Sequence, residues 1–261
     1  MTVPLARTPR KTIARLERIT MRDVPRHALP PLIDRLFAIF QEFFADVDRD
    51  GFVARYLSDG STRLALCYGD DGALVGFSAA AISRVEVAGR AHVVFSAPVL
   101  ISLGYRAGAE VALFGLTEAL LVKLGRPWAP LAYVAATATP ASYGLFARTM
   151  TRFYPSVRGP APEAVVEAME QVRRQRRLER VGESPWVVRS SRPLGAQRLA
   201  AEGAMRDDQH AAFFREASPR WLEGEALLVW IPLDLANIAS GVVRASLGRW
   251  RARRSSPRGA R

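Results

Sequence analysis

The chain has 261 residues, 49% of them hydrophobic, and a formal net charge of +12. This is enough apolar material for one large core or two smaller ones. The single cysteine, Cys67, excludes an intrachain disulfide and a zinc cluster of several thiolates, and we expect it to fill space in a strand. The basic segment 1–11 lacks the apolar stretch of a secretory signal, and prolines interrupt the uncharged run 127–147. We therefore expect a soluble, cytoplasmic protein.

Arginine is concentrated in three blocks along the chain. Such blocks can bind nucleic acid or an anionic membrane surface, or they can be solvated faces of helices. The sequence contains no pattern typical of a zinc finger, a basic zipper or an RNA-binding aromatic motif, so we do not expect nucleic-acid binding. An anionic membrane surface stays open as a partner. The blocks are Arg7, Arg10 and Lys11; Arg173, Arg174, Arg176, Arg177 and Arg180; and Arg249, Arg251, Arg253, Arg254, Arg258 and Arg261.

The first third of the chain predicts a strand, two helices and a hairpin. Thr12–Ile19 alternates apolar and polar residues, as a strand does. Leu29–Phe44 has apolar residues at helical spacing, and a shorter helix capped by Asp50 continues to Leu57. Arg63–Tyr68 and Ala73–Val87 are predicted strands joined by a Gly-Asp-Asp-Gly turn.

The middle of the chain predicts a crossover. The strand Ala91–Ser102 is largely uncharged, which is typical of a central strand covered on both faces. A glycine-containing loop leads into a helix over Ala109–Leu124, which Gly125 and Pro127 end. The next strand is Leu131–Thr137, so a strand–helix–strand connection predicts that these two strands are parallel. Thr139 and Pro140 then begin a helix that reaches Met150.

The last part of the chain is predicted as helices and short strands. Arg206–Glu216 is a loop or short helix, in which Asp207, Asp208 and His210 are expected to cap and shape the loop. An amphipathic helix begins near Asp234 and gathers arginines toward its end. The other segments are an exposed helix in 160–180 and strands at Pro185–Ser190 and Glu225–Leu233.

This order of elements resembles the GNAT superfamily of acyltransferases over Thr12–Leu233. The strand Val93–Ser102 and the loop after it are similar to the family's acyl-CoA-binding segment. Thr137–Met150, followed by Phe-Tyr-Pro at 153–155, is similar to its last strand and helix. The resemblance implies an α/β (α+β) fold with a mixed, mostly antiparallel sheet, a splayed parallel pair and flanking helices. It also implies three regions: a basic tail 1–11, a GNAT-like domain 12–233 with a helical insertion at about 160–184, and an amphipathic basic helix and tail 234–261.

The same resemblance implies an acyl-CoA-dependent N-acyltransferase that acts on an unidentified amine. Acetyl-CoA or another acyl-CoA would be the co-substrate, and no metal is implied. The loop amides would hold the pyrophosphate at the helix N-terminus, glycines would let the backbone approach, and Arg106 would add charge. The alternative is a plain strand-to-helix turn. The loop consists of Leu103, Gly104, Tyr105, Arg106, Ala107, Gly108 and Ala109.

Two residues are candidates for catalysis by this resemblance. Tyr143 would protonate the leaving thiolate, and Glu86 would be the base for the attacking amine. The alternatives are a tyrosine that packs in the core and a glutamate that is solvated near a turn. A GNAT-like protein without catalysis, which binds a ligand or partner and attaches to an anionic membrane through its last helix, is the second functional hypothesis. The sequence predicts neither the acceptor nor the oligomeric state.

Overall fold

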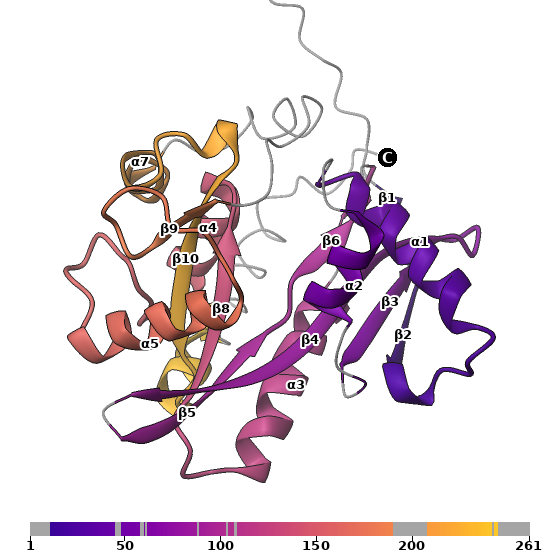
Figure 1. Cartoon of the computed structure of the whole chain (residues 1–261), viewed down its shortest axis with the longest axis horizontal. Coiled ribbons are helices and arrows are strands. Elements are labelled where there is room, and N and C mark those ends of the chain that lie inside the picture. Colours follow the sequence, from indigo (N-terminus) through magenta and orange to yellow (C-terminus); the bar gives the residue numbers. More distant parts are fainter. Residues whose placement is uncertain are drawn as a thin grey trace, which may run out of the picture. The chain divides into compact units, whose positions relative to one another are not determined.

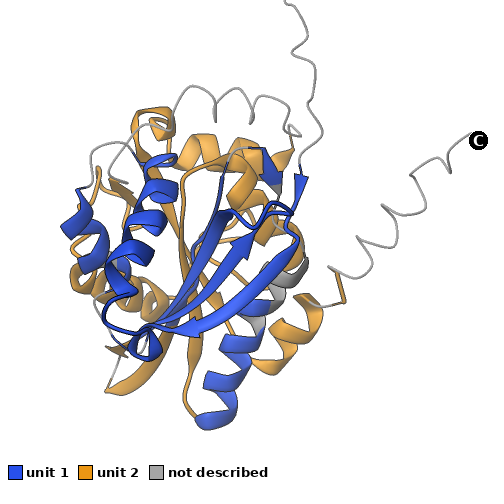
Figure 2. Ribbon diagram, turned by 90° about the vertical axis from the view of Figure 1, so that its right-hand side faces the viewer, with its two compact units in different colours: residues 1–82, 95–127, 194–199 blue, residues 83–94, 128–193, 200–261 orange. Residues whose placement is uncertain are grey.

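The computed structural model describes residues 11–44, 48–57, 60, 62–87, 89–102, 104–106, 109–189, 208–241 and 243–244. The chain divides into two compact units (Figure 2). Unit 1 comprises residues 1–82, 95–127 and 194–199, and unit 2 comprises residues 83–94, 128–193 and 200–261. Each unit is described by itself below.

Unit 1 contains an antiparallel ladder that begins at strand β2 (Arg15–Thr20). Strand β2 pairs with β3 (Arg63–Tyr68), and β3 pairs with β4 (Leu74–Val87). A short strand, β6 (Val99–Ile101), also pairs antiparallel with β4. Because side chains alternate across a pleated sheet, Leu64, Leu66 and Phe77 share one face of this ladder.

One face of this ladder is covered by α1 (Leu29–Gln41) and α2 (Arg49–Tyr56) (Figure 1). The 3-10 turn η1 (Met21–Asp23) leads from β2 toward α1. Phe40 and Phe52 lie at the centre of the core, with ring centroids 4.9 Å apart. Burying each aromatic ring removes a large apolar area from water, so this cluster stabilises the unit strongly.

The other elements of unit 1 follow β6. The short strand β7 (Tyr105–Arg106) pairs in parallel with β1 (Lys11–Thr12). Helix α3 (Ala109–Gly125) begins directly after it, on the side of the ladder opposite to α1. The contacts that place α3 there run from Arg18 to the ring of Phe114 and from Arg63 to Glu118.

Unit 2 is built around β10 (Glu225–Pro232), whose residues are almost all buried. Strand β10 lies between β8 (Leu131–Thr137) and β9 (Val187–Arg189), antiparallel to both. Strand β5 (Arg90–Ser96) neighbours β4 and β8 in the hydrogen-bonded order, and the N–H of Val93 donates to the carbonyl of Pro130 at 2.8 Å. The sequence of a strand that is buried on both faces is typically a continuous apolar run, and most of 225–232 is such a run.

The helices of unit 2 are α4 (Pro140–Thr149), α5 (Glu163–Gln175) and α7 (Gln209–Ala217). Helices α4 and α7 pack against each other through Tyr143 and Phe214. Gln171 of α5 bonds to the backbone of β4 at Glu86, and its amide caps an otherwise open strand edge. The 3-10 turn η2 (Trp221–Glu223) precedes β10, and residues 235–241 are helical after it.

The fold class is the predicted one: a mixed α/β arrangement, mostly antiparallel, with a parallel pair and flanking helices. The element order also follows the order that the resemblance implied. The parallel pair with a defined register, β1 with β7, was not predicted. The predicted parallel strands correspond to β5–β6 and β8, and β5 and β8 are neighbours, as the crossover requires.

Three local predictions were wrong. The predicted first strand is two strands, because β1 pairs with β7 whereas β2 pairs with β3, and between them Ala14 N–H donates to Tyr68 O at 2.9 Å. The strand 91–102 is interrupted at Pro98, which has no N–H for a ladder. Asp48, not Asp50, caps α2, since its side chain accepts from Gly51 N–H at 2.7 Å. The predicted domain bounds stay a prediction. Residues 1–10 of the predicted basic tail and residues 245–261 of the predicted C-terminal helix and tail lie outside the described residues.

The start of α4 offers a test of the fold. Thr139 and Ser142 form a capping box, in which the Thr139 hydroxyl accepts from Ser142 N–H at 3.2 Å. We expect Thr139→Val, which keeps the volume and removes the hydroxyl, to lower the free energy of unfolding by about 1 kcal/mol. Urea denaturation with Thr139→Ser as the matched control measures it. Equal stability of the two variants would show that the cap contributes nothing.

Candidate functional site

The segment between β6 and α3 is held by backbone hydrogen bonds. Ser102 N–H donates to Val75 O at 2.8 Å, and Tyr105 N–H donates to Ser102 O at 3.1 Å. Gly104 lies at φ +94°, a conformation that residues with a Cβ rarely adopt. Its carbonyl accepts from Lys11 N–H at 2.8 Å. The predicted acyl-CoA loop is therefore a tight glycine turn that is fastened to β1, followed at once by a helix.

The hairpin turn after β3 lies against this loop. A Cβ added to Gly69 would lie 2.8 Å from the hydroxyl of Tyr105, so only glycine fits there without a shift. The Tyr105 ring also lies under the ammonium of Lys11, 5.9 Å from its centroid. Of the predicted loop, Gly104, Tyr105 and Arg106 have a described backbone, and α3 begins at Ala109, as predicted. Leu103, Ala107 and Gly108, which are also predicted to belong to this loop, lie outside the described residues.

Tyr143 lies in the interior of unit 2. Its side chain is 0% exposed, and its hydroxyl donates to the carbonyl oxygen of Pro155 at 3.0 Å. Its ring contacts Phe153 and stacks on Phe213, 5.6 Å away. Burial raises the pKa of the hydroxyl above the ordinary value of 10.0, against the opposing charge of Arg158. These contacts are those of a packing tyrosine, and its role as a general acid stays a prediction.

Glu86 lies near the end of β4, where its side chain is exposed and its backbone is bonded to Gln171. Its role as a base stays a prediction. Nearby in sequence, burial and the charge of Arg90 lower the pKa of His92, so this imidazole is mostly neutral at pH 7.

Asp208 is confirmed as a cap. Its carboxylate accepts from the N–H groups of His210 and Ala211, both at 3.0 Å, at the start of α7. Burial opposes its ionisation, but these hydrogen bonds and the charge of Arg148 lower its pKa overall. Asp208 therefore has a structural function in unit 2.

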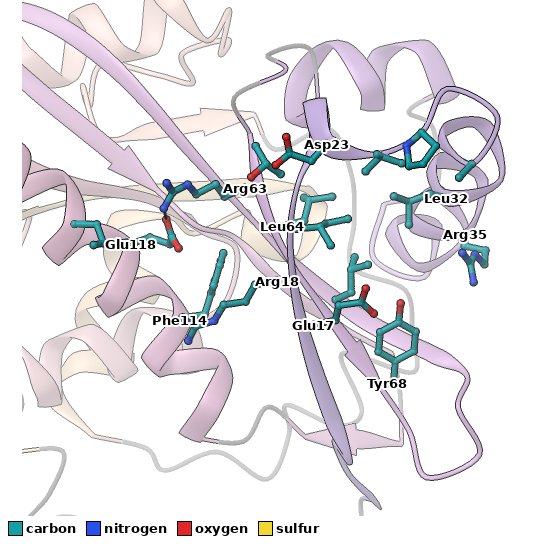
Figure 3. Close-up of a pocket in the computed structure, with 17 residues that line it drawn as sticks. Glu17, Arg18, Asp23, Leu32, Arg35, Arg63, Leu64, Tyr68, Phe114 and Glu118 are labelled. Carbon is teal, nitrogen blue, oxygen red and sulfur yellow. Dashed lines mark hydrogen bonds and ion pairs between the residues drawn. The ribbon is translucent and has the colours of Figure 1, made fainter.

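The sequence did not predict a cavity of about 640 Å³ in unit 1. The cavity lies against β2 and is lined by side chains from both faces of that strand (Figure 3). Leu32 and Arg35 border it from α1, and Phe114, Glu118 and Leu121 border it from α3. Its volume falls in the usual range for ligand sites. None of the predicted site residues is among its lining residues.

An ion pair lies on the α3 side of this cavity. Arg63 donates to Glu118 at 2.8 Å; the side chain of Glu118 is 9% exposed and that of Arg63 is 50% exposed. Arg18 points toward Phe114, with its guanidinium 5.8 Å from the ring centroid (Figure 3). The alternation in Arg15–Thr20 indicates that β2 has two different faces, but no pattern in the sequence indicates a cavity along both of them.

Among the residues that the structure describes, no group of three or more His, Cys, Asp or Glu side chains could hold a metal ion. The helices in that part of the chain are also too short or too polar to cross a membrane.

The chain is similar in fold to several solved structures, one of which is described as a GNAT-family acetyltransferase. The Escherichia coli ElaA structure is 19% identical, with a TM-score of 0.32, over 54% of this chain and 87% of that chain. A GNAT-family acetyltransferase from Staphylococcus aureus Mu50 is 14% identical, with a TM-score of 0.34, over 57% of this chain and 91% of that one. No protein-family model and no curated protein matches the sequence.

A third solved structure is described as a putative phosphinothricin N-acetyltransferase. It is 14% identical, with a TM-score of 0.32, over 57% of this chain and 91% of that chain.

Tyr143 provides a test that separates packing from catalysis. Tyr143→Phe removes the hydrogen bond to Pro155, and we expect a loss of about 1 kcal/mol in the free energy of unfolding at pH 7. In the parent protein the raised pKa favours the folded state fully below pH 10, and this stability is lost as pH rises through the folded pKa. The variant should lack this alkaline loss.

Denaturation between pH 7 and pH 11 measures both effects. Tyr154→Phe, on a neighbouring tyrosine whose described contacts are backbone hydrogen bonds, is the matched control. An unchanged stability of Tyr143→Phe together with a large fall in the rate of acyl transfer would contradict the packing role.

Proposed function

We propose that this protein is an acyl-CoA-dependent N-acyltransferase that transfers an acyl group, with acetyl as the first candidate, to an amine. The observation that carries the proposal is the crossover after β6: a glycine turn at φ +94°, a helix that starts at Ala109, and strand β8 from Leu131. The element order around it agrees with the order that the resemblance implied.

The helix start supplies the chemistry for binding. The first four N–H groups of an α-helix have no partner within the helix and carry a partial positive charge. Such an end binds phosphate well, and Gly104 lets the chain turn sharply before it. The N–H of Tyr105 is already bonded to Ser102, so a pyrophosphate would be held by the first turn of α3.

The reaction itself needs a free amine and a thioester. The amine nitrogen attacks the thioester carbonyl, a C–N bond forms, the C–S bond breaks, and the thiolate takes a proton. Glu86 and Tyr143 are the candidates for removing and supplying the protons.

The second candidate is a GNAT-like protein that binds acyl-CoA or another ligand without turnover. The contacts of Tyr143 favour it, because a hydroxyl that is buried and bonded to Pro155 cannot reach a substrate without a rearrangement. In this case the loop binds a ligand and no acyl transfer follows.

Both candidate functions include binding of acyl-CoA at the loop. Calorimetry with acetyl-CoA, longer acyl-CoAs and free CoA tests this binding. We expect Arg106→Ala to weaken binding about tenfold, since a guanidinium–phosphate contact contributes about 1.5 kcal/mol. Arg126→Ala, at the exposed opposite end of α3, is the matched control and should bind like the parent.

Thiol release in the presence of a panel of amines separates the two candidates. Binding with amine-dependent release supports the enzyme, and binding without release supports the second candidate. If the parent protein binds none of these CoA species, the proposal that the loop before α3 binds acyl-CoA is wrong.

A further inference from the structure

The free edge of β2 is the feature that the proposed function leaves unused. Strand β2 is the first strand in the order of its sheet, with β3 as its neighbour. The N–H of Met21 donates to the carbonyl of Thr62 at 3.0 Å and extends the β2–β3 ladder by one pair. Residues of an antiparallel ladder alternate between pairs that exchange both hydrogen bonds and pairs that exchange none. Counting from Met21, the backbone groups that point away from β3 belong to Leu16, Arg18 and Thr20.

The cavity of about 640 Å³ lies along this edge. Its lining contains Glu17 and Ile19 from one face of β2 and Arg18 and Thr20 from the other. Since residues of both faces contact one cavity, the open space passes around the edge of the strand. Helix α1 borders the space on one face and α3 borders it on the other, so the space has the position of a further strand next to β2 (Figure 3).

The two faces of this slot have different chemistry. On the α1 face lie Leu32, Leu64 and Leu66, which belong to the core of unit 1, together with Glu17 and Arg35 at its border. On the α3 face lie Arg18 and the Arg63–Glu118 pair. An added strand points alternate side chains to the two faces. Its side chains would therefore be apolar on one face and charged on the other.

The charges in the lining indicate which charge the added strand should carry. Each carboxylate in the lining already has a cation: Glu17 pairs with Arg15, Asp23 with Arg22 and Glu118 with Arg63. Within the described part of the chain, no ion pair is formed by the two other lining cations, Arg18 and Arg35. The slot therefore has unpaired positive charge, and a strand with acidic side chains complements it.

A second copy of the chain fits the edge poorly. A two-fold axis between two β2 strands must pair outward residues with outward residues. The registers that keep most of the strand paired place Arg18 opposite Arg18 or Glu17 opposite Glu17, and like charges directly opposite each other destabilise a sheet. The charge pattern of β2 thus opposes self-pairing and favours a different chain.

We propose that the edge of β2 is a docking site for an extended acidic segment of another polypeptide, which adds to the sheet as a strand with alternating apolar and acidic side chains. The backbone groups of Leu16, Arg18 and Thr20 supply the main-chain hydrogen bonds, and the slot between α1 and α3 takes the side chains. An acidic residue opposite Arg18 forms the cross-strand ion pair. The inference is independent of acyl transfer.

Peptide binding to the full chain tests it. The probe is an eight-residue peptide of alternating valine and glutamate, capped at both ends, and the control peptide has lysine in place of glutamate. We expect only the glutamate peptide to bind. Since the residue opposite Arg18 exchanges both backbone hydrogen bonds with it, N-methylation of the glutamates should abolish binding, whereas N-methylation of the valines should preserve it.

A charge reversal tests the register. Arg18→Glu should weaken binding of the glutamate peptide about fivefold and should bind the lysine peptide instead, since a cross-strand ion pair contributes up to about 1 kcal/mol. Arg90→Glu, an exposed residue in unit 2, is the matched control and should bind like the parent. Equal affinity of the parent for both peptides would overturn the proposal.

Amide exchange followed by NMR locates the contact. The peptide should slow exchange at Leu16, Arg18 and Thr20, whereas Glu17 and Ile19, already bonded to β3, should not change. Protection without this alternation would contradict an added strand. Protection of the same three amides that rises with protein concentration in the absence of peptide, together with a dimer in sedimentation, would show that a second copy occupies the edge and would overturn the proposal.

Discussion

The pairing of β2 with β3 is the constraint on which unit 1 depends. The register Ile19 with Leu64 sends apolar side chains to the core under α1, and the pairs between send Arg18 and Arg63 toward α3. A slip of one residue would exchange the two faces, placing arginines in the core and leucines beside Glu118. The phenylalanine cluster of α1 and α2 therefore fixes the register, and the register in turn fixes the chemistry of the cavity.

The turn before α3 depends on the same part of the structure. Lys11, just upstream of β2, donates to Gly104 O, and Gly69, just after β3, leaves room for the Tyr105 hydroxyl. The turn before α3 is thus positioned by one end of the β2–β3 pair, where Arg15 lies opposite Tyr68, and not by the loop sequence alone. The backbone of the glycine turn is therefore held by partners outside the loop.

The sequence predicted the elements best where one local signal dominates. The β3 and β8 bounds were correct to the residue, since charge-free or hairpin-flanked runs have sharp ends. The break at Pro98 has a local cause, since proline lacks the N–H that a ladder needs, whereas the division between β1 and β2 depends on which strand each one pairs with, which no local pattern encodes. The β1–β7 pair was missed for the same reason: two residues carry no periodicity, and the pair exists because distant parts of the chain meet.

The candidate site shows the corresponding limit for chemistry. Its place on a helix makes Tyr143 a predicted acid, but its ring packs against Phe153 and Phe213 from two other segments, and its hydroxyl donates to Pro155 O in the same segment as Phe153. The position of a residue on a helix can be predicted from the sequence, whereas the hydrogen-bond partner of its hydroxyl depends on packing between distant segments. The cavity at β2 is the converse case: no single lining residue is unusual, and the cavity arises because β2 is the edge strand of its sheet in the described part of the chain, with α1 and α3 bordering the space beside it. The residues that line this cavity are therefore determined by β2 being the last strand at this edge of the sheet.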